Sequence, residues 1–81
     1  MSPPTLRNLT EILGAYVDLS ALDVTEASTL GDDIPVDSQD MLRVISRIQA
    51  VYGITLKAPD LFRVATMGDL LAAVRRRLSV A

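Results

Sequence analysis

The sequence contains no cysteine, no histidine and no tryptophan, and its only aromatic residues are Tyr16, Tyr52 and Phe62. Without cysteine or histidine there can be no disulfide, no thiolate or imidazole metal ligand, and no cysteine or Ser–His nucleophile. Carboxylates remain as the main acid–base groups, and no paired set of them is evident on one rigid element. An enzyme is therefore the least favoured class of function.

Long apolar runs are also missing. No run of about 18 apolar residues is present, so the sequence predicts no membrane-spanning helix. The start, Met1 to Pro4, lacks the basic segment followed by an apolar one that marks a secretory signal. We therefore expect a cytoplasmic protein. The 81 residues suit a single domain (residues 1–81, with an ordered core at about 5–78), and the 49% apolar content, mainly aliphatic, suits packed helices.

Charged residues are unevenly distributed, although the formal net charge is only −2. Residues 1–40 carry one basic residue against eight acidic ones, whereas residues 41–81 carry seven basic residues against two acidic ones. This polarity could orient the domain against a charged partner. It could equally be a soluble surface whose opposite charges attract one another, and the sequence favours neither interpretation.

Hydrophobic periodicity predicts an all-α fold, a small bundle of three main helices and one short helix. The first main helix should span residues 5–17. The second should span residues 38–52 and stop at Gly53, a typical helix terminator. The last should begin at Thr66, where Asp69 three residues later gives a pattern like a capping box.

The second main helix has the most regular apolar stripe. Its inward face should carry Met41, Ile45, Ile48 and Tyr52, widened by Leu42, Val44 and Val51. Its outward face should carry Gln39, Arg43, Arg47 and Ala50. In the last helix the inward residues should be Met67, Leu70, Leu71, Val74 and Leu78. We expect these two helices to supply much of the core.

About 20 residues between the first two main helices keep no helical pattern and should form a loop, which at this length is usually functional or disordered. Its apolar residues can anchor it to the core, so we expect an ordered, exposed loop with room for one helical turn. These anchors are Leu19, Leu22, Val24, Leu30, Ile34 and Val36. Further on, residues 54–56 form an extended link, and Pro59 opens the short helix.

A serine stands where the long loop meets the second main helix. Asp37 has the side chain of an N-cap, Ser38 is the first helical residue, and Asp40 adds negative charge to the first turn. The positive end of a helix is a favourable place for a phosphate group. A serine in this setting is nevertheless most often plain capping, so these three residues alone do not decide its role.

A longer pattern surrounds Ser38. The stretch from Leu30 to Leu42, LGDDIPVDSQDML, resembles the acyl carrier protein family. Matching residues continue through Ile48, Tyr52, Gly53, Ile54 and Leu56, and the resemblance extends from about Leu6 to Leu78. It implies that Ser38 carries 4′-phosphopantetheine, taken from coenzyme A, through a phosphodiester, with Asp37 as a recognition neighbour. The missing cysteines agree with this, because the reactive thiol would belong to the cofactor.

The resemblance also implies a function. The protein would be a carrier without catalysis of its own, which holds acyl or related intermediates as thioesters for partner enzymes. Its partners would be a phosphopantetheinyl transferase and the enzymes that load and use the cargo, and we expect a monomer. Residues for partner recognition would be Asp33, Gln39, Asp40, Arg43 and Arg47. Residues that could line an acyl pocket are Ile45, Ile48, Phe62, Val64, Leu70 and Leu71, although each taken singly is better explained as ordinary core.

Departures from the family pattern bear on the pathway. Pro35 stands where the family usually has glycine, which fixes the backbone before the serine. Gln39 replaces the usual leucine beside the serine. Arg43, Arg47 and Gln49 occupy a helix that is strongly acidic in fatty-acid carriers. Polyketide, aminoacyl or other secondary-metabolite assembly is therefore at least as well supported as primary fatty-acid synthesis.

Two alternatives from other classes remain. A helical interaction domain that is never modified would have the same bundle. Nucleic-acid binding through the three arginines at 75–77 is opposed by the acidic first half and by the lack of a recognition-helix pattern.

Overall fold

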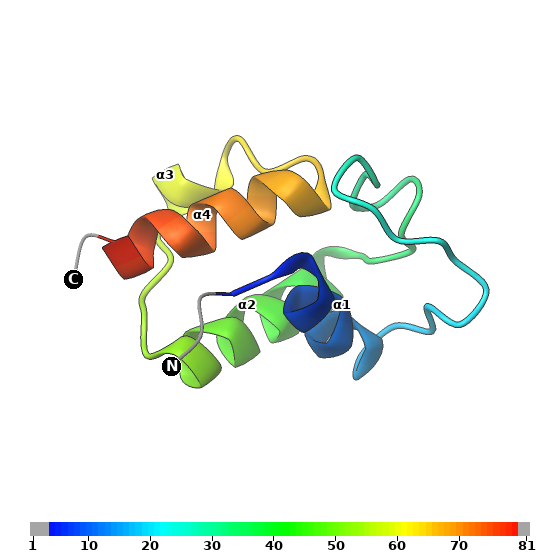
Figure 1. Cartoon of the computed structure of the whole chain (residues 1–81), viewed down its shortest axis with the longest axis horizontal. Helices are drawn as coiled ribbons and strands as arrows, with labels where there is room; N and C mark the ends of the chain where they lie inside the picture. The colour runs from blue at the N-terminus through cyan, green and yellow to red at the C-terminus, as the bar shows by residue number, and fades with distance from the viewer. Residues whose placement is uncertain (1–3, 80–81) are drawn as a thin grey trace.

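The structure is a computed structural model that describes residues 4–79. Within this range the chain forms four helices and no β-strand (Figure 1). The helices are α1 (Leu6–Gly14), α2 (Ser38–Tyr52), α3 (Ala58–Leu61) and α4 (Met67–Ser79). The predicted all-α class, with three main helices and one short helix, is confirmed. None of these helices is long and apolar enough to cross a membrane.

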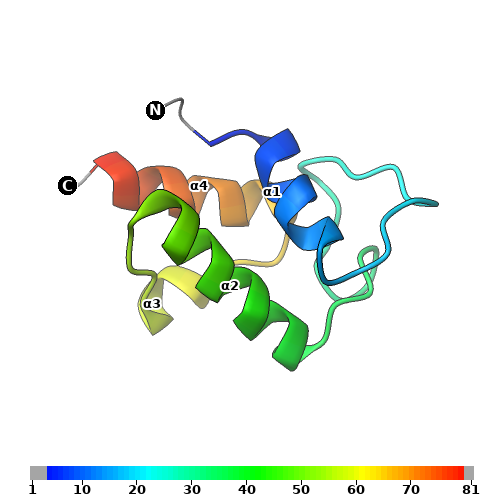
Figure 2. The ribbon, with the colours of Figure 1, turned by 90° about the horizontal axis from the view of Figure 1, so that it is seen from below.

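Helix α1 lies across α2 and α4 and packs against both, while α3 packs on α4 (Figures 1 and 2). Aliphatic side chains from the three longer helices and from the loop segments meet in one core. Its buried members are Leu9, Leu13, Val17, Ile34, Val36, Val44, Ile48, Leu56, Met67, Leu70, Leu71, Ala73 and Val74. Burial of these apolar surfaces is the main force that holds the short helices together, because such helices are marginal alone.

The inward stripe predicted for α4 is confirmed, with Leu78 partly buried and the other four residues buried. In α2 the stripe is narrower than predicted. Val44 and Ile48 are buried, but Leu42 is 67% exposed and Val51 is 41% exposed. Leu42 lies two residues from Val44, which is about 200° around a helix, so it faces away from the core. Because both side chains are exposed, the prediction that Leu42 and Val51 widen the buried stripe was wrong.

Helix α1 ends at Gly14, three residues before its predicted end at residue 17. The N–H groups of Tyr16 and Val17 both donate to the carbonyl oxygen of Leu13, each at 2.9 Å. This tightened turn ends the helix but still places Val17 in the core, where it is 8% exposed. Tyr16 is left 39% exposed.

The long loop (residues 15–37) is ordered, as predicted, because it docks on the start of α4 (Figure 1). The Met67 N–H donates to the Ser28 carbonyl at 3.0 Å, and the Gly68 N–H donates to the Glu26 carbonyl at 2.9 Å. N–H groups in the first turn of a helix have no partner inside the helix, so the loop satisfies two of them for α4. Turns such as the one between Thr25 and Ser28 take the place of a helical turn.

The capping box predicted at the start of α4 is confirmed. The Asp69 N–H donates to the Thr66 hydroxyl at 3.1 Å, and the Thr66 N–H donates to Asp69 Oδ2 at 3.1 Å. Asp69 Oδ2 also accepts the Ala65 N–H at 3.0 Å. The two backbone bonds that the Asp69 carboxylate accepts, that of Ala65 first and then that of Thr66, hold the pKa of Asp69 below its ordinary value.

Candidate attachment site

Ser38 is placed by a cap at the start of α2. Asp37 has an extended backbone, with φ −99° and ψ −177°, and its Oδ1 accepts the Asp40 N–H at 2.8 Å. In return, the Asp37 N–H donates to Asp40 Oδ2 at 3.4 Å. The N-cap predicted at Asp37 is confirmed, and Asp40 completes a capping box. At the other end, Gly53 terminates α2 with a left-handed φ of 65°, also as predicted.

The Ser38 hydroxyl is free. Ser38 is exposed, and its hydroxyl makes no hydrogen bond to any residue from 4 to 79. By contrast, the hydroxyls of Ser20, Ser28 and Ser79 bond to their own neighbours. Ser46 is also exposed, but it lies in the middle of α2. Among residues 4–79, Ser38 is thus the serine that begins a helix and whose exposed hydroxyl has no hydrogen-bond partner.

Two backbone donors lie beside this hydroxyl. The N–H groups of Ser38 and Gln39 have no acceptor among residues 4–79, whereas those of Asp40 and Met41 are bonded to Asp37. Free N–H groups at the positive end of a 15-residue helix can receive phosphate oxygens. The local donor set therefore fits a phosphate ester on Ser38.

The backbone before the serine accommodates Pro35. The N–H groups of Gly31 and Val36 both donate to the Ile34 carbonyl, each at 2.8 Å, and the hydrogen-bonding pattern needs no N–H at position 35. Ile34 is 1% exposed and fixes this segment to the core. Pro35 is therefore compatible with an ordered backbone in the segment before Ser38.

Of the residues predicted to recognise partners, four lie on α2, and Asp33 lies in the long loop before it. Asp33 Oδ2 accepts the Thr29 N–H at 2.9 Å and the Thr29 hydroxyl at 3.0 Å, which lowers the pKa of Asp33. Gln39, Arg43 and Arg47 are exposed on α2. Their role in recognition stays a prediction.

The six residues predicted to line an acyl pocket are not equivalent. Ile48, Leu70 and Leu71 are buried, and Ile45 and Val64 pack partly buried against the core. Phe62 is 81% exposed. It follows the four-residue helix α3, which itself has no buried residue. Phe62 does not line the interior in this structure, and the acyl pocket stays a prediction.

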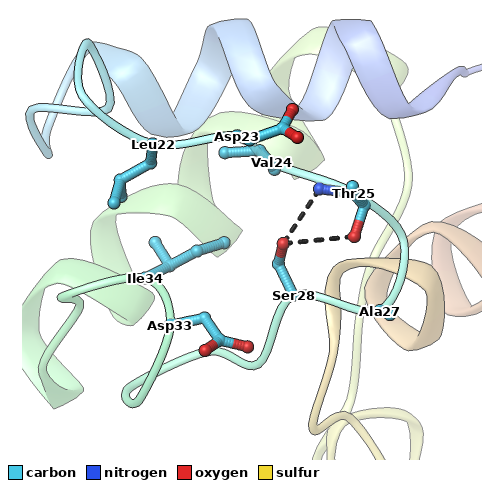
Figure 3. A pocket seen from close by; sticks show the side chains of 8 residues that line it. All are labelled: Leu22, Asp23, Val24, Thr25, Ala27, Ser28, Asp33 and Ile34. Atoms are coloured by element: carbon cyan, nitrogen blue, oxygen red, sulfur yellow. Dashed lines mark hydrogen bonds between the residues drawn. The ribbon is translucent and has the colours of Figure 1, made fainter.

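A hollow of about 330 Å³ lies in the long loop, at a place that the sequence did not indicate (Figure 3). Most of the polar groups that line this hollow are hydrogen-bonded to other residues of the loop. The Ser28 hydroxyl accepts the Thr25 N–H at 2.9 Å, and the Asp33 carboxylate is bonded to Thr29. No group of three or more metal-binding side chains occurs in residues 4–79. We interpret this hollow as a feature of the loop rather than a second site.

Comparison with known proteins agrees with the geometry. Residues 7–74 match the family described as "Phosphopantetheine attachment site". The chain belongs to this carrier family. Its relatives include an acyl carrier protein of Thermotoga maritima, which is 25% identical over 67 residues, or 83% of each chain. Meromycolate extension acyl carrier proteins of Mycolicibacterium aurum and Mycolicibacterium smegmatis are each 25% identical over 71 residues, which cover 88% of this chain and 73% and 72% of theirs. No match to a solved structure was found.

The predicted acyl carrier family is thereby confirmed, and so is its cofactor, a covalently attached 4′-phosphopantetheine. The protein is a carrier with a phosphopantetheine attachment domain. Such a cofactor needs an accessible hydroxyl and room for a phosphate, and the start of α2 offers both.

Proposed function

We propose that this carrier bears its 4′-phosphopantetheine on Ser38 and holds acyl or related intermediates as thioesters on the thiol of that arm. The observation that supports this most directly is the exposed, unbonded Ser38 hydroxyl at the capped start of α2. Ser46 is exposed too, but its helical neighbours leave no free N–H groups beside it for a phosphate.

Attachment forms a bond between Ser38 Oγ and the phosphorus next to the pantetheine of coenzyme A. Adenosine 3′,5′-bisphosphate leaves, and the hydroxyl proton passes to a base. This chain offers no base there, because it has no histidine and no carboxylate is hydrogen-bonded to the Ser38 hydroxyl. The transferase must therefore supply the base, while the carrier supplies an accessible nucleophile on a rigid helix.

The pathway is proposed from the residues beside Ser38. Gln39, Arg43 and Arg47 give α2 a different surface from that of an acidic fatty-acid carrier, which supports polyketide, aminoacyl or other secondary-metabolite assembly. Because meromycolate extension carriers are among the relatives, specialised lipid synthesis is a further candidate pathway. Primary fatty-acid synthesis remains the alternative. We expect a cytoplasmic monomer that meets a phosphopantetheinyl transferase and then loading, synthase or transferase enzymes.

Intact-mass spectrometry tests the attachment. The purified chain is measured first, because a host transferase could already have modified it, and then after incubation with coenzyme A and a broad-specificity transferase. The wild type and Ser46→Ala should gain one phosphopantetheine group, and Ser38→Ala should gain none. No modified species at either stage would support the unmodified interaction domain instead. A gain that persists in Ser38→Ala would place the arm on another residue.

A further inference from the structure

Exposed apolar side chains gather where α1 meets the outer part of α2. Five large apolar residues are exposed in residues 4–79, and three of them, Tyr16, Leu42 and Val51, lie around two hollows at this junction. Both hollows are shallow and open to solvent, with volumes of about 430 Å³ and about 260 Å³, and both are lined by Arg47. The larger hollow defines what we name the α1–α2 surface: Tyr16, Leu42, Arg43, Ser46, Arg47 and Ala50.

This surface is cationic as well as apolar. Arg43 and Arg47 are four residues apart on α2, where like charges cost a few tenths of a kcal/mol. Neither forms an ion pair with a residue from 4 to 79, whereas Arg7 pairs with Glu11 and Arg77 pairs with Asp60. Two exposed guanidinium groups without an ion-pair partner among residues 4–79, beside exposed Leu42 and Tyr16, leave positive charge and apolar surface that one bound partner could cover together.

We propose that the α1–α2 surface docks a protein segment that carries two carboxylates beside an apolar side chain, on an enzyme that uses this carrier. The apolar side chain enters the hollow between Tyr16 and Leu42, and the carboxylates pair with Arg43 and Arg47. A guanidinium group suits this role because its planar donors match a carboxylate. That the partner is an enzyme that uses this carrier rests on the function proposed above. The binding of such a segment to the α1–α2 surface does not.

The order of acidic and basic residues along α2 determines the orientation in which a partner enzyme can bind. Asp37 and Asp40 lie at the end that bears Ser38, and Arg43 and Arg47 lie about 8 Å and about 14 Å further along the axis from Ser38, at 1.5 Å per residue. A matching enzyme presents basic residues near its entrance for the arm and acidic residues about one to three turns away. An enzyme with an entirely basic docking face would be repelled by the arginines.

Other occupants fit less well. A nucleic acid or an anionic bilayer would bring many phosphates, and Asp37 and Asp40 at the start of the same helix would oppose them. A second copy could offer its acidic loop. The carboxylates of Asp18 and Asp33 are already bonded to Ser20 and Thr29, which leaves Asp23, Glu26 and Asp32, and the sedimentation measurement below decides this case. Discrete carboxylates on a different protein match the two arginines best.

Peptide titration of the full-length apo protein, followed by NMR of its ¹⁵N-labelled amides, tests this surface. The probe is a synthetic helical peptide with glutamates at i and i+4 beside a leucine, and the control peptide has lysines in their place. The glutamate peptide should shift the amides of Leu42, Arg43, Ser46 and Arg47. Arg43→Glu with Arg47→Glu should weaken its binding about tenfold, as expected for two exposed ion pairs reversed in sign.

The matched control is Arg63→Glu with Arg76→Glu, which reverses two exposed arginines beside α3 and α4 and should leave binding unchanged. Shifts confined to residues 75–77, or no shifts, would overturn the proposal. So would tighter binding of a DNA duplex or of phosphatidylserine vesicles at the same salt, or a dimer in sedimentation that the Arg43→Glu, Arg47→Glu variant loses. Ser38→Ala should bind the peptide like the wild type, so this result is independent of the attachment test.

Discussion

Asp37 and Asp40 each accept a hydrogen bond from the other's backbone at the start of α2, at 2.8 Å to Asp37 Oδ1 and 3.4 Å to Asp40 Oδ2. The shorter bond carries most of the cap, because hydrogen bonds weaken with distance. Asp37 also places a negative charge next to Ser38. Capping and charge can be separated experimentally, because asparagine caps a helix about as well as aspartate does.

The Asp37→Ala variant should lose about 1 kcal/mol of unfolding free energy, because the Asp40 N–H loses its acceptor. The Asp37→Asn variant should stay within a few tenths of a kcal/mol of the wild type. If the transferase recognises the charge, both variants should be modified more slowly than the wild type. Urea unfolding gives the stabilities, and mass spectrometry over time gives the rates. An asparagine variant as unstable as the alanine variant would argue against the cap.

Acid should weaken the attachment of α3 to α4. Asp60 Oδ2 accepts the Lys57 N–H at 2.8 Å and bonds from Arg77 Nε at 2.9 Å and Nη2 at 2.7 Å. The Lys57 bond first, and then Arg77, lowers the pKa of Asp60 below its ordinary value of 3.8. Because the folded-state pKa is the lower one, this stabilisation is present above the ordinary value and is lost as pH falls through the lowered pKa.

The Asp60→Asn variant should therefore be less stable than the wild type at pH 7, and the two stabilities should converge in acid. Urea unfolding over a series of pH values measures this difference. Glu11→Gln is the control, because its pair with Arg7 is 66% and 88% exposed and should contribute little. A constant difference between Asp60→Asn and the wild type at all pH values would mean that Asp60 ionisation is not linked to folding.

Substitution by alanine should change the free energy of unfolding in opposite directions at two glycines. At Gly68 a Cβ would lie 3.0 Å from the Glu26 carbonyl oxygen, so Gly68→Ala should push the long loop from α4 and cost about 1 to 3 kcal/mol. At Gly14 nothing lies within 4 Å of that position, so Gly14→Ala should gain up to about 1 kcal/mol from helix propensity. Thermal unfolding measures both. A stable Gly68→Ala protein would show that the loop can yield at this contact.

Local signals in the sequence predicted the helix ends that local chemistry determines. Asp37 and Gly53 bound α2, and Thr66 with Asp69 begins α4, because a cap involves only a few neighbouring residues. The end of α1 could not be predicted in this way. Tyr16 and Val17 continue the apolar spacing, although the chain turns at Leu13, and Val17 is buried in the core beyond the end of the helix.

The same distinction between local signals and tertiary packing applies to the candidate site. Ser38 could be singled out from its cap and from the family pattern around it, because both lie within a short stretch. The exposure of Phe62 and Leu42, and the hollow that Tyr16 forms with α2, depend on how the helices pack. The docking of the loop on α4 joins Glu26 to Gly68, which are far apart in the sequence, and no local pattern encodes such contacts.

The long loop should prove to be part of the core rather than a flexible link. Ile34 is 1% exposed, and its N–H donates to the Thr29 carbonyl at 2.9 Å, whereas Leu22 on the same loop is 39% exposed. Ile34→Ala should cost about 2 to 5 kcal/mol by leaving a cavity, and Leu22→Ala should cost less than about 1 kcal/mol. Urea unfolding measures both. Equal costs would mean that Ile34 is not packed, and the loop could not then hold Asp37 and Ser38 in place.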